Sequence, residues 1–281
     1  MVNAPSMPVG IFDSGIGGLS VLRHIRAQLP VESLCYFADS GFAPYGEKPA
    51  ELVIDRTLSI ARYLLSLPCK ALVVACNTAT AEAIHILRAH YPATPIVGIE
   101  PGLKPATQVT KNGIIGVMAT ERTLMSHKFQ RLYEQLRQET GMTFIMQACP
   151  GLADRVEHND LYSARTEQLV LGYVRPLMAQ DADTIVLGCT HYPFLEDCIK
   201  KSIRQCTDRE VQLVDTGVAV TRQLVRVLQR ENLTAAEKAV FADTRAFTTG
   251  NAHTLAEQFE QLLHIQANVS AVPIETTPNI V

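Results

Sequence analysis

The sequence lacks several features that would place it in a specialised class of protein. Its 281 residues hold 25 Lys and Arg against 28 Asp and Glu, so it has no basic excess that would favour nucleic-acid binding. Its apolar runs, such as Ala71–Cys76, are far too short to cross a bilayer. The first ten residues lack a basic region followed by a long apolar stretch, so we expect no secretory signal. These absences predict a cytoplasmic protein that binds neither nucleic acid nor membrane.

The seven cysteines also lack a pairing pattern. Their number is odd and no CxxC pair occurs, which excludes an obvious disulfide framework or zinc site. Hydrophobic residues make up 47% of the chain and charged residues 19%, a composition typical of a globular protein. A chain of this length can bury a sizeable core without metal or disulfides. We therefore expect free thiols and no metal.

Short apolar runs alternate with amphipathic stretches along the whole chain. Strands are predicted at 9–12, 34–38, 71–75, 96–99, 114–118, 143–147, 184–187 and 211–214, with one or two more near 245–249 and 271–274. Helices are predicted between them, at about 22–29, 51–67, 78–90, 122–139, 163–178, 218–230 and 254–263. This alternation predicts two similar α/β domains with mainly parallel sheets and helices on both faces.

The two halves of the chain resemble each other. In the first half a strand ends at Asp13-Ser14, and a later strand ends at Cys76. In the second half a strand ends at Ala119-Thr120, and a later strand ends at Cys189. The segment Pro101–Pro105 is the best boundary between the halves. We predict a first domain from residues 1–100 plus 210–281 and a second from 101–209, with the active site in the cleft between them.

Cys76 and Cys189 differ from the other cysteines, which are expected to be small core residues. Each follows the carboxyl end of a predicted buried strand, where open α/β sheets bind their ligands. A helix is predicted to begin just after Cys76, and a helix N-terminus would lower its thiol pKa toward neutrality. Two such thiols suit proton transfer on both faces of one carbon, which inverts a stereocentre.

The glycine-rich turn after the first strand, residues 13–18, permits two interpretations. It follows a strand, opens a helix and has Asp39 about twenty residues on, as in dinucleotide-binding folds. However, Gly15-x-Gly17-x-x-Ser20 lacks the third glycine, and Asp13 precedes the turn. The alternative is that Ser14 and the backbone N–H groups hold a substrate carboxylate. His191, two residues after Cys189, could tune the protonation of that thiol. Glu157 by itself resembles a surface carboxylate.

Five sequence blocks together resemble the glutamate racemases of the cofactor-independent aspartate/glutamate racemase superfamily. They are GIFDSGIGGLSV (10–21), DSGFAPYGEK (39–48), ALVVACNTATA (71–81), GVMATERT (116–123) and VLGCTHYPFL (186–195), with a weaker sixth, FTTGNA (247–252). They run in family order across nearly the whole chain. The resemblance implies racemisation of glutamate without pyridoxal phosphate, metal or any other cofactor. It also implies a bacterial cytoplasm, where D-glutamate serves peptidoglycan synthesis, and allows a homodimer.

The resemblance also implies a role for individual residues. Cys76 corresponds to the thiol that acts on D-glutamate and Cys189 to the one that acts on L-glutamate, with Asp13 and His191 as their respective partners. The expected substrate-binding residues are Asp13, Ser14, Tyr45, Gly46, Asn77, Thr78, Thr120, Thr190 and His191. Glu157 is of second rank, because CPGLADRVE (149–157) is less apolar than the usual family run. The sequence begins without the long N-terminal extension that accompanies activation by a cell-wall precursor in some members, so we do not expect that activation.

Three other functions remain open at this point. Aspartate racemases tend to have a histidine where Thr80 stands and a glutamate where His191 stands, so these residues favour glutamate. A cysteine-nucleophile hydrolase would use one thiol and leave the other idle. A non-catalytic amino-acid binding protein would need neither thiol.

Overall fold

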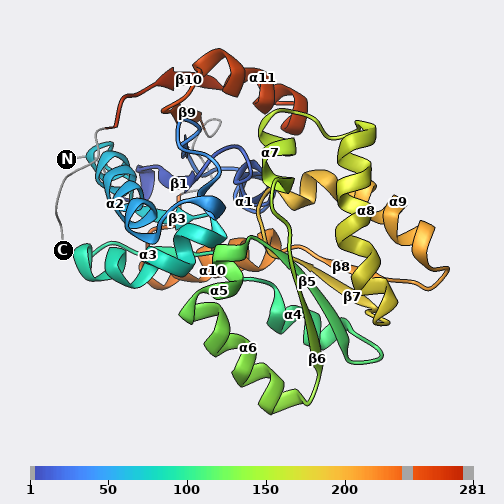
Figure 1. Cartoon of the computed structure of the whole chain (residues 1–281). Helices are drawn as coiled ribbons and strands as arrows, with labels where there is room; N and C mark the ends of the chain where they lie inside the picture. The colour runs from blue at the N-terminus through green and yellow to red at the C-terminus, as the bar shows by residue number, and fades with distance from the viewer. Residues whose placement is uncertain (1–3, 236–242, 275–281) are drawn as a thin grey trace.

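The computed structural model describes residues 4–235 and 243–274. In this part of the chain two parallel sheets lie side by side with helices packed around them (Figure 1). The first sheet has the order β10-β9-β2-β1-β3-β4, and the second has the order β6-β5-β7-β8. All the strand pairs are parallel. The structure thus confirms the predicted class of two α/β units with parallel sheets.

The first sheet is built from both ends of the described chain. Its strands are β1 (Val9–Asp13), β2 (Leu34–Ala38), β3 (Ala71–Val74), β4 (Ile96–Gly98), β9 (Thr244–Thr248) and β10 (Asn268–Ala271). Alternate residues of β1 point to opposite faces, as the pleat requires. Ile11 packs in the core beneath α1 (Leu19–Gln28), α10 (Gly217–Arg230) and α11 (Ala252–Leu263). Phe12 packs in a separate core beneath α2 (Ala50–Ser66) and α3 (Asn77–His90).

The second sheet is likewise covered on both faces. Its strands are β5 (Ile114–Ala119), β6 (Thr143–Ala148), β7 (Thr184–Leu187) and β8 (Gln212–Val214). Val117 faces the core beneath α4 (Leu103–Val109), α5 (Glu121–Met125) and α6 (His127–Thr140). Met118 faces the core beneath α8 (Ala164–Ala179) and α9 (Glu196–Cys206), which is continuous with the α1 side of the first sheet. The short elements are α7 (Leu152–Glu157) and the 3-10 turns η1 (Ala4–Ser6), η2 (Tyr45–Glu47) and η3 (Tyr192–Leu195).

The two sheets repeat one topology. The order β2-β1-β3-β4 in the first corresponds to β6-β5-β7-β8 in the second. In each, the chain passes to one side of the central strand and then to the other, which leaves a crevice at the carboxyl ends of β1 and β3, or of β5 and β7. The repeat predicted from the sequence is therefore present in the fold, and each unit has a natural ligand-binding crevice.

Some predicted elements were wrong in their bounds. The single helix expected at 122–139 is two helices, α5 and α6, because the Ser126 side chain accepts the Phe129 N–H at 3.2 Å and starts a new helix. The strand expected at 271–274 is β10, which ends at Ala271. The helices α4, α7 and α9 were not predicted. Two of these are short, whereas α9 is amphipathic, with Cys198, Ile199 and Ile203 on its buried face, and was overlooked.

The connections between the sheets lie near residues 99–102 and 215–216. We propose the division into domains near these connections, because β9 and β10 return to the first sheet. β8 pairs with β7, so the second sheet extends to Val214, slightly beyond the predicted boundary at 209. Among the described residues, no helix is both long and apolar enough to span a membrane.

Candidate active site

Both candidate thiols follow central strands at the carboxyl edges of the sheets. Cys76 comes just after β3, and Cys189 comes just after β7. Cys76 is the N-cap of α3, where its Sγ accepts the Ala79 N–H at 3.4 Å and its thiol donates to Ser14 Oγ at 3.8 Å. Only 5% of Cys76 and 7% of Cys189 are exposed to solvent. The two sulfurs are close enough that the charge of Cys189 contributes to the pKa of Cys76.

The environment of Cys76 favours its protonated form. Burial, followed by the negative charge of Asp13, raises the thiol pKa of Cys76 well above its ordinary value. The expectation that the helix N-terminus lowers this pKa was therefore wrong. The single Ala79 N–H that bonds the sulfur does not offset the loss of water and the nearby carboxylate.

Asp13 connects the two crevices. It is the last residue of β1 and is fully buried. Its Oδ1 accepts the Ser14 N–H at 2.8 Å, and its Oδ2 accepts the Thr190 hydroxyl at 3.1 Å. Burial raises the pKa of Asp13, while the nearby His191 opposes that shift. The Cys76 thiol also lies close enough to this carboxylate to help lower the pKa of Asp13. Asp13 is therefore placed beside both the Cys76 thiol and the Thr190 hydroxyl.

The second thiol has a different neighbour. Cys189 Sγ lies 3.4 Å from His191 Nδ1, and His191 Nε2 lies 2.6 Å from Glu157 Oε1. Burial by itself would lower the pKa of His191, but the Cys189 and Glu157 side chains raise it well above its ordinary value. Both ring nitrogens face an acceptor, so the protonated ring donates to each. The His191 ring thus presents its positive charge to Cys189, while Glu157 binds the far side of the ring.

Glu157 belongs to the site although its sequence context gave little sign of it. Its Oε1 also accepts the Ile16 N–H of the glycine-rich turn at 2.9 Å. A Cβ on Gly15 would lie 1.9 Å from that oxygen, and one on Gly17 would lie 2.5 Å from His191 Nδ1. These two glycines therefore let the Glu157–His191 pair approach the turn closely.

The turn is thus filled by protein side chains, which argues against a dinucleotide. A pyrophosphate would have to occupy the space that Glu157 and His191 hold. Asp39, the residue expected to bind a ribose, is instead fully buried and paired with Arg56 at 2.7 Å. Within residues 4–235 and 243–274, no group of three or more His, Cys, Asp or Glu side chains is arranged as a metal site.

Hydroxyl groups from the two units meet on the side of Cys76. Thr78 Oγ1 lies 3.1 Å from Thr120 Oγ1, which in turn donates to Thr123 Oγ1 at 2.9 Å. Gly46 packs against Thr120, since a Cβ on Gly46 would lie 2.7 Å from Thr120 Cγ2. The Tyr45 hydroxyl donates to Asp39 Oδ2 at 2.5 Å, so it does not face the other predicted residues. The structure thus brings Gly46, Thr78 and Thr120 together.

Asn77 has a buried amide with unused hydrogen-bonding capacity. It lies between Cys76 and Thr78 at the start of α3 and is 4% exposed. Neither its amide nitrogen nor its amide oxygen has a hydrogen-bond partner in the described part of the chain. Such buried polar atoms are rare unless a ligand or water completes them.

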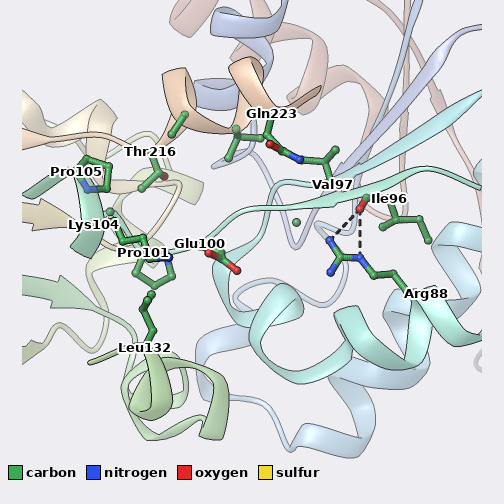
Figure 2. Close-up of a pocket in the computed structure, with 14 residues that line it drawn as sticks. Arg88, Ile96, Val97, Glu100, Pro101, Lys104, Pro105, Leu132, Thr216 and Gln223 are labelled. Carbon is green, nitrogen blue, oxygen red and sulfur yellow. Dashed lines mark hydrogen bonds between the residues drawn. The ribbon is translucent and has the colours of Figure 1, made fainter. Parts of the chain in front are cut away.

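Several cavities lie in the described part of the chain, and two of those described here border predicted site residues. One of about 200 Å3 is bordered by Gly46 and Thr120 and by the Cys149–Asp154 turn. Another of about 270 Å3 is bordered by Ser40, Glu157 and Asn251. A third of about 410 Å3 lies where the chain passes between the sheets and includes none of the predicted site residues. Figure 2 shows this third cavity, with the Arg88 guanidinium bonded to the Ile96 carbonyl at its edge.

Comparisons with known proteins agree with this geometry. Residues 17–224 match the model of the Asp/Glu/hydantoin racemase family. A glutamate racemase of Cupriavidus pinatubonensis is 47% identical over 278 residues, 99% of each chain. A crystal structure of a Bacillus anthracis glutamate racemase is 35% identical, with a TM-score of 0.86 over 96% of this chain and 99% of that one. An Escherichia coli glutamate racemase solved with L-glutamate and the activator UDP-MurNAc-Ala is 29% identical, with a TM-score of 0.80 over 96% and 99%.

Proposed function

The chain belongs to the Asp/Glu/hydantoin racemase family, and on this premise we propose that Cys76 and Cys189 interconvert L- and D-glutamate by proton transfer on opposite faces of the α-carbon. The observation that carries the proposal is the pair of buried thiols, one at the crevice of each repeated unit, with Asp13 beside one and His191 beside the other. A single-thiol hydrolase would leave one of these arrangements without use.

From L-glutamate, the reaction begins at the Cys189 side. The Cys189 thiolate removes the α-proton while the His191 imidazolium holds the sulfur and stays paired with Glu157. The Cys76 thiol, which its surroundings keep protonated, then delivers a proton to the opposite face. The result is D-glutamate, with Cys76 as thiolate and Cys189 as thiol.

From D-glutamate the same steps run in reverse. Cys76 must now be the base, and the Asp13 carboxyl is the group placed to take or return its proton. Asp13 is also linked to Thr190, the residue after Cys189, at 3.1 Å. Asp13 thus lies between the Cys76 thiol and the residue that follows Cys189.

Glutamate brings two carboxylates and one ammonium to this site. We assign the carboxylates to neutral donors in the turns, namely Ser14, the Gly46 backbone, Asn77, Thr78, Thr120 and Thr190. The unpartnered amide of Asn77 supports this assignment. The ammonium is assigned to the Asp13 side. The Tyr45 hydroxyl, already bonded to Asp39, contributes through the position of its neighbour Gly46 rather than by contact.

The experiment that tests the function is direct. Purified protein is incubated with L-glutamate without added cofactor, and the circular dichroism signal of glutamate is followed over time. We expect this signal to decay to zero, and to reach the same end point from D-glutamate. Aspartate should be turned over much more slowly, whereas equal rates would contradict the assigned substrate. Asn77→Ala should weaken glutamate binding by about 1–3 kcal/mol if the amide bonds a carboxylate.

We further propose that the enzyme supplies D-glutamate for peptidoglycan in a bacterial cytoplasm, as the family resemblance implies. The curated relatives that cover nearly the whole chain support this role. We also propose a homodimer, which sedimentation analysis of the purified protein would test.

A further inference from the structure

A second buried polar group lies behind the turn that carries Gly46. Asp39 follows β2 and is fully buried, and four donors surround its carboxylate. Oδ1 accepts Arg56 Nη2 and Thr249 Oγ1, each at 2.7 Å. Oδ2 accepts Arg56 Nε at 2.9 Å and the Tyr45 hydroxyl at 2.5 Å. These donors satisfy the usual capacity of a carboxylate, so the group is held in one orientation.

Arg56 is as buried as its partner. It projects from α2, and its side chain is 0% exposed. Its remaining Nη1 donates to the Ile274 carbonyl at 2.8 Å, and its guanidinium lies 3.9 Å from the centre of the Phe42 ring. Phe42 belongs to the same loop as Tyr45, and its N–H donates to the Asp39 carbonyl at 2.8 Å. Arg56 of α2 therefore links the loop 40–48 to Ile274.

The Asp39–Arg56 pair bonds Tyr45, which immediately precedes the proposed substrate contact Gly46 in the sequence. Tyr45 starts the turn η2, and the next residue, Gly46, packs against Thr120 of the second unit. Thr120 in turn lies 3.1 Å from Thr78. An unbroken series of contacts thus runs from the Asp39–Arg56 pair through Tyr45 to the hydroxyls assigned to a carboxylate.

We propose that the Asp39–Arg56 pair, acting through the Tyr45 hydroxyl, positions the Gly46 backbone for substrate binding. Asp39, Arg56 and Tyr45 are then positioning residues, and this inference rests on the proposed function. Their role differs from that of a buried ion pair that only supports the fold. The chain offers such a pair for comparison in Lys70 and Glu32, whose side chains are 1% and 0% exposed.

Lys70 and Glu32 lie just before β3 and β2, at the amino edge of the same sheet. Glu32 also accepts the Ala235 N–H, and Lys70 donates to the Pro5 carbonyl. The two pairs therefore match in burial and in sheet, but they lie at opposite edges. Lys70→Met is the control that weakens the fold without touching the loop 40–48.

The decisive variant is Tyr45→Phe, which removes one donor and leaves the ion pair intact. We expect the KM for both L- and D-glutamate to rise about fivefold to tenfold, because one charge-assisted hydrogen bond is lost. The kcat should change much less. Arg56→Lys, which keeps the charge but not the two-pronged contact, should raise the KM less than Arg56→Met. Lys70→Met should lower the urea midpoint and leave the KM unchanged.

A second readout does not depend on racemase activity. Amide hydrogen exchange of residues 40–48 should be faster in Tyr45→Phe than in the wild type or in Lys70→Met. An unchanged KM together with unchanged exchange in Tyr45→Phe would overturn the inference. A wild type that does not racemise glutamate would instead contradict the proposed function, and the exchange rates would still decide whether the pair positions the loop.

Discussion

The two halves of the active site share a backbone plan but differ in charge. Each places a cysteine after the third strand of a repeated α/β unit. Cys76 has the Asp13 carboxylate beside it, and Cys189 has the His191 ring, which Glu157 holds. One thiol thus faces a negative partner and the other a positive partner. The repeat supplies the geometry, while the residues added to it give each sulfur a different electrostatic neighbour.

This difference extends to the protonation of Cys76 and of His191. The pKa of Cys76 is raised by burial and by Asp13, and that of His191 is raised by its two partners. Both shifts favour a Cys76 thiol in one half and a His191 cation in the other. The two enantiomers have equal free energies, so kcat/KM must still be the same in both directions. The asymmetry can therefore appear in kcat and KM taken separately and in individual steps, but not in kcat/KM.

Replacing either thiol should have the largest effect. Cys76→Ser and Cys189→Ser should each reduce racemisation by about 10³-fold or more, because a serine hydroxyl is too weak an acid to exchange the proton. Circular dichroism measures the loss. Cys198→Ser, a buried cysteine of α9 outside the site, is the control and should keep its activity. Full activity in either of the first two variants would remove that cysteine from the mechanism.

Replacing Asp13 or His191 should distinguish the proton-transfer step at Cys76 from the step at Cys189. Asp13→Asn and His191→Asn should each lower kcat/KM by about 10²-fold. In Asp13→Asn the step at Cys76 becomes limiting, so the isotope effect of α-deuterated D-glutamate should exceed that of the L enantiomer. In His191→Asn the order should reverse. Equal isotope effects in both variants would show that the partners are not assigned to separate thiols.

A smaller change is expected from replacing Glu157, which pairs with His191. Glu157→Gln keeps the size of the side chain and an acceptor for Ile16 but removes the charge that helps to raise the pKa of His191. We expect kcat/KM to fall about tenfold. We expect the wild-type kcat/KM to be bell-shaped in pH, because catalysis needs one thiolate and one thiol at once. In Glu157→Gln the alkaline limb should move to lower pH, because the imidazolium is lost sooner. Glu167→Gln, which affects a partly exposed pair with Lys201, should leave the profile unchanged.

The smallest expected effect is on stability. The folded state raises the pKa of His191, so this group binds more protons when folded than when unfolded. Its contribution to the free energy of unfolding is complete below the unfolded pKa of about 6.5 and is lost as the pH rises through the folded pKa. Urea midpoints should therefore fall above about pH 6.5, and less steeply in His191→Asn. Parallel curves for the two proteins would contradict the shift.

The sequence predicted most of the strands and the place of both cysteines at strand ends, because these depend on local patterns. A buried strand that ends in a polar turn is visible at Cys76 and Cys189 without knowledge of the fold. Glu157 could not be ranked in this way. Its partners His191 and Ile16 lie 34 and 141 residues away, and only the packing of α7 against the glycine-rich turn brings them together.

Contacts between residues distant in sequence also explain why the pKa of Cys76 and the orientation of Tyr45 could not be predicted. A helix N-terminus after Cys76 could be predicted, but the burial that raises the thiol pKa depends on the tertiary packing around Cys76. Tyr45 could be placed in a turn by its neighbours Pro44 and Gly46. That its hydroxyl faces Asp39 and Arg56 depends on α2, a separate element of the fold.

Solvent isotope incorporation tests the two-thiol mechanism most directly. L-Glutamate is incubated in D2O with the wild type and sampled early by NMR. The D-glutamate formed should carry deuterium at the α-carbon, since its proton comes from a solvent-exchanged Cys76, while the remaining L-glutamate stays largely protiated. The reverse experiment from D-glutamate should give the mirror result through Cys189. Product that keeps the original protium in both directions would show that one base serves both faces, and would contradict the account.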